Sequence, residues 1–193
     1  MQYQNNTYKE RLVMAINLEK GNGICLDKGL SRVAFTVSWD TSEDVDISAM
    51  LLENGRGKRD EDFVFFRNLI HESGAVVHSG DIRNGSHALG VDDEVVDIYL
   101  NKVPANITEI VLVADIYNVA SKGLHFGKIA NSTAKIVDLD TNRVLASFQL
   151  DKDLIGQTTC ELARLVHDNG AWKFENLSHP VMSLTGALTS RGF

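Results

Sequence analysis

The stretch Asp44-Val45-Asp46-Ile47-Ser48-Ala49 decides the fold class of this chain. Polar and apolar residues alternate in it one by one. On a β-strand this period of two places the polar residues on one face and the apolar residues on the other. A strand with one apolar face has to bury that face against a second layer. The stretch therefore predicts a half-buried strand, over residues 45–52, in a layered β structure.

Similar short apolar runs, rich in β-branched and aromatic residues, recur on both sides of this stretch and are separated by turn residues. They predict further strands at 12–18, 23–26, 32–39, 62–66, 75–79, 95–100, 109–117, 133–137, 143–150, 162–167 and 172–177. The last two form a hairpin through Asn169-Gly170, a pair suited to a turn with positive φ. Residues 125–131 fit one or two turns of helix. The chain is therefore predicted to be all-β: an antiparallel two-sheet β-sandwich with at most one or two short helices.

The length of 193 residues, with 44% hydrophobic and 23% charged residues, is typical of one globular domain. We expect this domain to span residues 10–180, with loosely ordered termini at 1–9 and 181–193. No stretch approaches the roughly 20 apolar residues that a membrane helix needs, and the apolar run at 12–16 is too short for a signal peptide. These features predict a cytoplasmic protein. A sequence pI near 5.3 argues against a nucleic-acid partner.

The acidic residues are crowded into one part of the chain. Of the 26 acidic residues, 14 lie between Asp40 and Asp97, together with five basic residues. Like charges repel one another in a folded domain. A bound cation would offset this repulsion, and a hard divalent ion is the first candidate.

Two groups of carboxylates are placed to bind such an ion. Asp44 and Asp46 lie at the start of the predicted strand 45–52, and the second group opens with Asp81 and closes with Asp92-Asp93-Glu94. Three glycines interrupt the second segment, and glycine-bearing loops let carbonyl groups turn toward a Ca²⁺ ion, which takes six to eight oxygen ligands. If both loops open at the same end of the sandwich, they enclose one or two ions.

The spacing alone leaves other interpretations open. Acidic loops are often simply solvated, because Asp and Asn are ordinary turn residues. The carboxylates also suit Mg²⁺ or salt bridges with Arg67 or Arg83. The run Asp138-x-Asp140-x-Asn142 begins like a calcium loop, but Arg143 stands where such a loop needs glycine, so it indicates a turn.

No pattern in the chain indicates an enzyme. The six histidines show no HxxxH or HExxH spacing, which argues against a zinc site. His78 and Ser79 are neighbours on a predicted strand, so their side chains point to opposite faces and do not form a nucleophile–base pair. No small-molecule substrate is indicated.

A set of motifs along the chain resembles the TerD family, which is associated with tellurite resistance and stress response. The motifs occur in the family's order and cover residues 10–178: Leu26-Asp27-Lys28-Gly29, Trp39-Asp40, Asp44-Val45-Asp46-Ile47-Ser48-Ala49, Phe63-Val64-Phe65-Phe66-Arg67-Asn68-Leu69, Val77-His78-Ser79-Gly80-Asp81, Arg83, Gly85, Asp92-Asp93-Glu94, Val103-Pro104-Ala105-Asn106, Phe126-Gly127 and Gly170-Ala171-Trp172-Lys173-Phe174.

The resemblance implies a β-sandwich that binds Ca²⁺ at its acidic loops and acts by binding without catalysis. The ligand positions that it implies are Asp44, Asp46, Asp81, Gly85, Asp92, Asp93 and Glu94. The implied partners are other proteins of a stress-response complex, or a membrane. A metal-independent scaffold subunit of such a complex is the alternative.

The second acidic loop departs from the family pattern. Ile82 stands in place of the family's usual asparagine, Ser86-His87 lie near its usual Glu-Gly, and the loop is about two residues longer. The family's first loop is often longer and more acidic than the stretch from Asp40 to Asp44. Because fewer oxygen donors weaken calcium binding, we expect a reduced or altered site.

Overall fold

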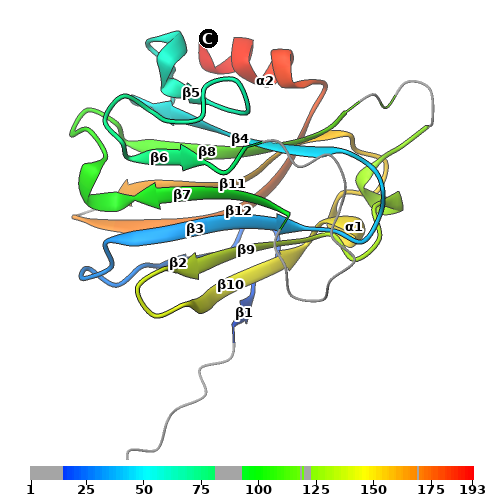
Figure 1. Cartoon of the computed structure of the whole chain (residues 1–193), viewed down its shortest axis with the longest axis horizontal. Helices are drawn as coiled ribbons and strands as arrows, with labels where there is room; N and C mark the ends of the chain where they lie inside the picture. The colour runs from blue at the N-terminus through cyan, green and yellow to red at the C-terminus, as the bar shows by residue number, and fades with distance from the viewer. Residues whose placement is uncertain (1–14, 81–92, 118, 120–122, 169) are drawn as a thin grey trace, which may run out of the picture.

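Two six-stranded β-sheets pack face to face in the computed structural model, which describes residues 15–80, 93–117, 119, 123–168 and 170–193 (Figure 1). The first sheet contains, in spatial order, β1 (Ile16–Asn17), β10 (Arg143–Gln149), β9 (Thr133–Asp138), β3 (Arg32–Ser38), β7 (Glu94–Tyr99) and β6 (Val76–His78). The second contains β2 (Gly23–Cys25), β12 (Ala171–Val181), β11 (Thr159–Asp168), β8 (Glu109–Ile116), β4 (Val45–Leu52) and β5 (Phe63–Val64).

The predicted all-β sandwich is confirmed, and every predicted strand region contains a strand. All strand pairs are antiparallel except β1 and β10, which run parallel over two residue pairs. The expected helical turn at 125–131 contains the 3₁₀ helix η4 (Phe126–Lys128). Other short helices are η1 (Asp60–Asp62), η2 (Leu100–Lys102) and α1 (Leu150–Asp153). None of the helices in the described part of the chain is long and apolar enough to cross a membrane.

The main core lies between the two sheets. Alternate residues of β4, namely Val45, Ile47, Ala49 and Leu51, point into it as the alternation predicts, and they meet inward-facing side chains such as Phe35 of β3. The other residues of β4 point to the outer face of the second sheet. This is why a strand of eight residues can have an apolar inner row and still present carboxylates at its start.

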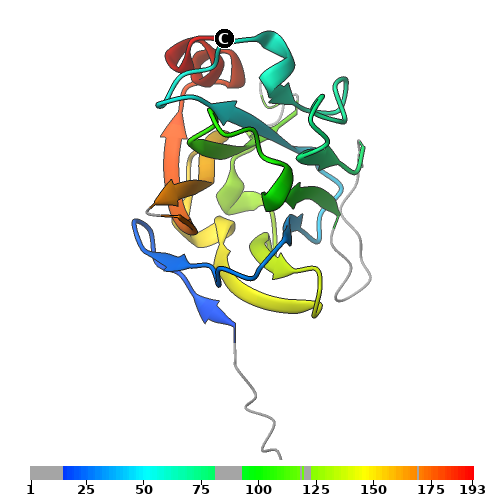
Figure 2. The same ribbon diagram turned by 90° about the vertical axis from the view of Figure 1, so that its left-hand side faces the viewer.

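A second, smaller core covers that outer face. Its buried residues are Met50, Leu52, Phe63, Val111 and Val113. The helix α2 (Leu184–Arg191) lies over them with its residues Leu184 and Leu188. Figures 1 and 2 place α2 and β1 at opposite sides of the molecule.

The helix α2 corrects one expectation, since a loosely ordered segment was predicted for 181–193. The hydroxyl of Ser183 caps the helix by accepting a hydrogen bond from Gly186 N at 3.0 Å. Arg191 makes a forked ion pair with Glu161 of β11, with N···O distances of 2.8 and 2.7 Å. The segment is ordered because it covers an apolar sheet face and pairs with a carboxylate 30 residues away, neither of which its own sequence reveals.

Gly57 provides a test of this C-terminal packing. A Cβ atom at Gly57 would lie 2.5 Å from the Phe193 ring, which itself packs against Phe63 with ring centroids 6.1 Å apart. Gly57→Ala should therefore displace Phe193 and lower the free energy of unfolding by about 1–3 kcal/mol, as measured by denaturant titration. Gly29→Ala is the control, because nothing lies within 4 Å of a Cβ there. Equal stability of the two variants would contradict the packing described.

Candidate functional site

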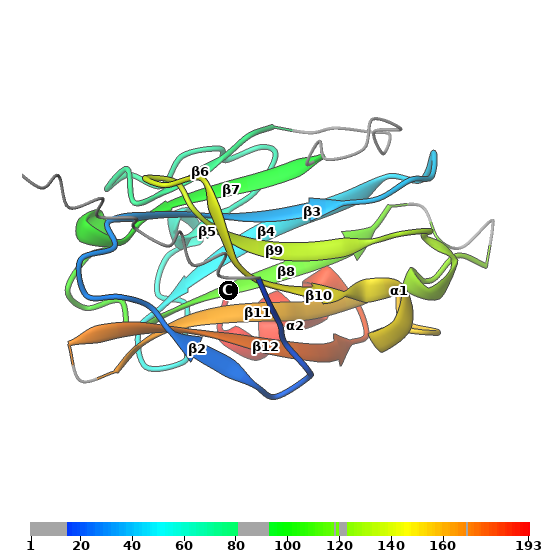
Figure 3. The ribbon, with the colours of Figure 1, turned by 90° about the horizontal axis from the view of Figure 1, so that it is seen from below.

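The described end of the second acidic segment meets the start of the first at one end of the sandwich, which is the condition that the sequence analysis set for a shared ion. Asp93, which directly precedes β7, makes two contacts with the end of β3. Its backbone N–H donates to Val37 O at 3.1 Å, and its Oδ2 accepts from the backbone N–H of Trp39 at 2.9 Å. The second acidic segment is therefore joined directly to the start of the first. Figure 3 shows the β3–β4 connection at the same end of the sheets as α1.

Side chains and strand neighbours hold the first acidic loop at both ends. The indole Nε1–H of Trp39 donates to Glu43 O at 2.8 Å, which closes the turn. Tyr117 N donates to Asp44 O at 2.9 Å and so extends the ladder between β8 and β4 up to the loop. Asp40 accepts a hydrogen bond from the amide of Asn131 at 2.6 Å. These contacts fix where Asp44 leaves the loop and enters the sheet.

Asp115 is a carboxylate at this end that sequence analysis missed. It lies directly opposite Asp46 on the neighbouring strand, and like charges in that position are destabilising. Burial raises the pKa of Asp115, and a hydrogen bond from the hydroxyl of Thr159 partly offsets this rise. The available signal was an aspartate at an outward-facing position near the end of a strand that is otherwise apolar after Glu109.

The carboxylates line a hollow on the outer face of the second sheet. Its volume is about 460 Å³, and its lining residues are Asp44, Asp46, Phe66, Arg67, Asp115, Tyr117 and Leu184. Three carboxylates thus face one guanidinium among these residues. The hollow offers carboxylate oxygens together with aromatic and aliphatic side chains.

His78 supports both acidic segments from inside the sandwich. Its Nδ1 accepts from Gly80 N at 2.9 Å, which assigns the ring proton to Nε2. Nε2 lies 2.7 Å from Ile47 O, to which it donates, and 3.4 Å from Oε2 of Glu94. Successive backbone carbonyls of β4 point toward the neighbouring strands on its two sides. The ladder between β4 and β5 covers two residue pairs and does not include Ile47. His78 of the first sheet therefore satisfies a backbone group of the second.

The predicted ligands do not all lie in the same environment. Asp44 and Asp46 line the hollow, whereas Asp93 and Glu94 are buried at the start of β7, with 2% and 0% of their surfaces exposed. Asp81, Gly85 and Asp92 lie outside the described residues. Within the part of the chain that the structure describes, no group of three or more His, Cys, Asp or Glu side chains is arranged to hold a metal. The seven-ligand calcium site stays a prediction.

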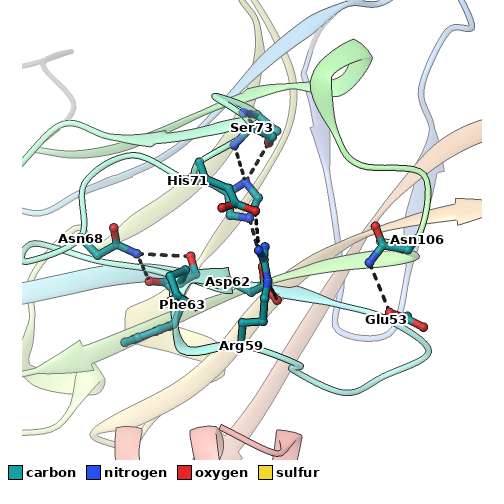
Figure 4. Close-up of polar contacts among 11 residues, drawn as sticks. Glu53, Arg59, Asp62, Phe63, Asn68, His71, Ser73 and Asn106 are labelled. Carbon is teal, nitrogen blue, oxygen red and sulfur yellow. Dashed lines mark hydrogen bonds and ion pairs between the residues drawn. The ribbon is translucent and has the colours of Figure 1, made fainter.

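A partly buried polar network stiffens the connection that leads to Phe66 (Figure 4). Arg59 pairs with Asp62 at 2.6 Å, and Asp62 also contacts Nε2 of His71 at 3.1 Å. Burial by itself would raise the pKa of Asp62, but the hydrogen bonds from Arg59 and His71 hold the pKa below its ordinary value. The network fixes the segment that presents the aromatic wall of the hollow.

Asp62, His71 and Ser73 are the residue types of a hydrolytic triad, but here their contacts stabilise a turn. Nδ1 of His71 lies 2.7 Å from Oγ of Ser73 and accepts from the Ser73 backbone N–H at 3.2 Å. The same hydroxyl oxygen accepts from Ala75 N at 3.1 Å. Both side chains are thus engaged in closing the turn 71–74.

The family model described as the TerD domain matches residues 14–189. Among curated proteins, general stress protein 16U of Bacillus subtilis (strain 168) is 36% identical over 172 residues, covering 83% of this chain and 88% of the relative. Tellurium resistance protein TerD of Serratia marcescens is 32% identical over 171 residues, with coverage of 83% and 88%.

Solved structures share the fold. A protein of unknown function, SAV2460, superposes with a TM-score of 0.69 at 23% identity and covers 86% of this chain and 99% of that chain. A homologue of the telluride resistance protein, SCO6318 from Streptomyces coelicolor A3(2), superposes with a TM-score of 0.66 at 21% identity, with coverage of 80% and 92%.

Replacing His78 by phenylalanine keeps the volume but removes both hydrogen bonds. Ile47 O then loses its partner in the buried interior, and Gly80 N loses its partner at a half-buried position, so the free energy of unfolding should fall by about 2–4 kcal/mol. Denaturant titration measures the change. His179→Phe, at an exposed position on β12, is the matched control. A His78→Phe variant as stable as this control would refute the bridging role.

The ion pair of Asp62 should make the free energy of unfolding depend on pH. Because the pKa of Asp62 is lowered in the folded state from 3.8, its contribution is fully present above pH 3.8 and is lost as the pH falls through the lower folded value. Asp62→Asn should therefore cost about 1.5–3 kcal/mol at pH 7, and the gap to wild type should narrow below pH 3.8. Thermal unfolding of both proteins at pH values above and below 3.8 measures this difference in stability. A difference that grows as the pH falls would contradict the prediction.

Proposed function

Because this chain belongs to the TerD family, we propose that it is a cytoplasmic stress-response protein that binds Ca²⁺ at its acidic end and acts by binding without catalysis. The family is linked to tellurium resistance and to stress response through its named members. That the chain binds calcium is our inference from the residues at that end.

The observation that carries the proposal is the meeting of the two acidic segments. The double contact of Asp93 with Val37 and Trp39 holds the end of one segment against the start of the other. On the outer face Asp46 and Asp115 stand directly opposite each other. Two facing carboxylates are costly unless a cation or a proton offsets their repulsion. All of these groups are oxygen donors, the class that Ca²⁺ prefers.

Asp44 and Asp46 are the first ligands that we assign, because their side chains line the hollow. Asp81, Gly85, Asp92, Asp93 and Glu94 complete the proposed set. A bound Ca²⁺ supplies positive charge that neutralises the carboxylates and orders the loops. The rest of the chain positions these groups: Trp39 and Tyr117 hold the first loop, and His78 supports the segment that begins at Gly80.

In this proposal the ordered end of the sandwich is the surface that binds partners. These would be other proteins of a stress-response complex, or a membrane surface reached through the ion. Tyr117 and Met182 are 64% and 98% exposed near the acidic hollow, and exposed apolar side chains are typical of interaction sites.

A metal-independent scaffold is the second candidate. It is favoured by the finding that the described residues hold no ready group of three ligands. In that case the carboxylates are solvated or paired with basic side chains, and Ca²⁺ leaves the protein unchanged.

Thermal unfolding with added Ca²⁺ separates the two candidates. A chelator-stripped protein at 100 times the dissociation constant of the ion should gain about 2.7 kcal/mol, or about 5–10 °C in Tm for a domain of this size. The same concentration of Mg²⁺ should shift Tm less, because Mg²⁺ gives up its water ligands reluctantly. No shift at millimolar Ca²⁺ supports the scaffold.

Single substitutions assign the ligands. Asp44→Asn, Asp46→Asn and Asp81→Ala should each weaken Ca²⁺ binding in a calorimetric titration, by about tenfold for loss of one carboxylate. Asp153→Asn, at an exposed position in α1, is the control and should bind as wild type does. An affinity unchanged by Asp81→Ala removes that residue from the site.

A further inference from the structure

The acidic hollow continues into an apolar one along the side of α2. The second hollow has a volume of about 480 Å³ and lies between the segment 60–66 and the helix. Phe66 and Leu184 line both hollows, so the two share a wall. Together they form a groove, named here the α2 groove, with an acidic end and an apolar end.

The acidic end of the α2 groove suits a positively charged group. Asp44, Asp46 and Asp115 lie on one side of it, and Arg67 is the basic residue of the lining. The aromatic rings of Phe66 and Tyr117 also line this end, and aromatic faces attract organic cations. The Phe66 ring already holds the guanidinium of Arg67, 5.2 Å from its centroid, so an incoming cation has the ring of Tyr117. A lysine or arginine side chain therefore fits both the charge and the walls.

The apolar end suits large hydrophobic side chains. Its walls are Phe63, Phe65 and Phe66 from one side and Leu188 and Phe193 from the other. Stacking of Phe63 on Phe65, with ring centroids 4.7 Å apart, keeps the aromatic wall in place. The polar network around Asp62 anchors the same segment. Rigid aromatic pockets of this kind are where interface anchors bind.

Phe66, at the junction of the two ends, is 39% exposed. An exposed apolar side chain beside charged groups is the usual composition of a protein-binding surface. A free ion or small cation would use the acidic end and leave the apolar end empty. A peptide segment uses both.

We propose that the α2 groove binds a segment of a partner protein in which a lysine or arginine lies next to large apolar residues. The cationic side chain enters the hollow of Asp44, Asp46 and Asp115, and the apolar side chains pack between Phe63 and Leu188. Binding needs no metal ion, so this proposal does not rest on the proposed calcium site, although the two share the carboxylates of Asp44 and Asp46.

Two matched peptides test the groove. The probe is the fluorescein-labelled peptide Lys-Leu-Leu-Phe, and the comparison peptide is Glu-Leu-Leu-Phe. Fluorescence anisotropy is measured with the full chain in chelator, so that the result does not depend on calcium. The lysine peptide should bind at least about tenfold more tightly, because the glutamate places like charges together. Equal binding of the two peptides overturns the proposal.

Variants then locate the site. Asp115→Asn should reduce the preference for the lysine peptide over the glutamate peptide. Phe66→Ser should lower the affinity for both peptides by the same factor. Asp153→Asn and Ile155→Ser are the matched controls, since both residues are exposed and lie outside the two hollows. Wild-type binding by Asp115→Asn and Phe66→Ser overturns the assignment to this groove.

A salt titration on the wild-type protein keeps the test independent of how the variants fold. The affinity for the lysine peptide should fall as salt is raised from 50 to 500 mM, because added ions screen exposed charge pairs. The affinity for the glutamate peptide should not fall. A lysine peptide that is insensitive to salt contradicts a role for the carboxylates.

Discussion

The burial of two apolar sheet faces against each other is the constraint on which the rest of this structure depends. Strands alternate their side chains between two faces, so filling the space between the sheets determines where every other residue can go. In β4 the inward positions of Val45, Ile47 and Ala49 oblige Asp46 and Ser48 to face outward. The polar groups near the start of the strand are thereby directed to the outer surface of the second sheet.

That same constraint leaves backbone groups at the end of the sandwich without strand partners, and a few side chains satisfy them. β5 pairs with β4 over two residues, and the Ile47 carbonyl beyond this ladder is met by His78 from the opposite sheet. Asp93 in turn receives the backbone N–H of Trp39. Buried polar groups of this kind are costly when they lose a partner. Hydrogen bonds that involve both sheets therefore hold the acidic end in place.

The outer face of the second sheet also carries apolar residues, and a helix covers them. Its apolar residues Met50 and Val111 are covered by α2, which is secured at its end by the pair of Arg191 with Glu161. The helix starts at Leu184, next to Asp115 and the acidic hollow. The acidic hollow and the apolar hollow are thus neighbours that share Phe66 and Leu184. In our two proposals Ca²⁺ and a basic peptide compete for the carboxylates of Asp44 and Asp46.

The sequence by itself determined the all-β sandwich, the regions of its strands and the acidic end. These are encoded by local alternation, by turn residues such as Asn169-Gly170 and by charge crowding, all of which are visible over a few residues. Only the tertiary structure decided that the tail forms α2, that His78 bridges the sheets and that Asp115 stands opposite Asp46. Each of these depends on contacts between segments that are 30 or more residues apart. A side chain's partner across the fold is set by strand register and sheet packing, and no local pattern records it.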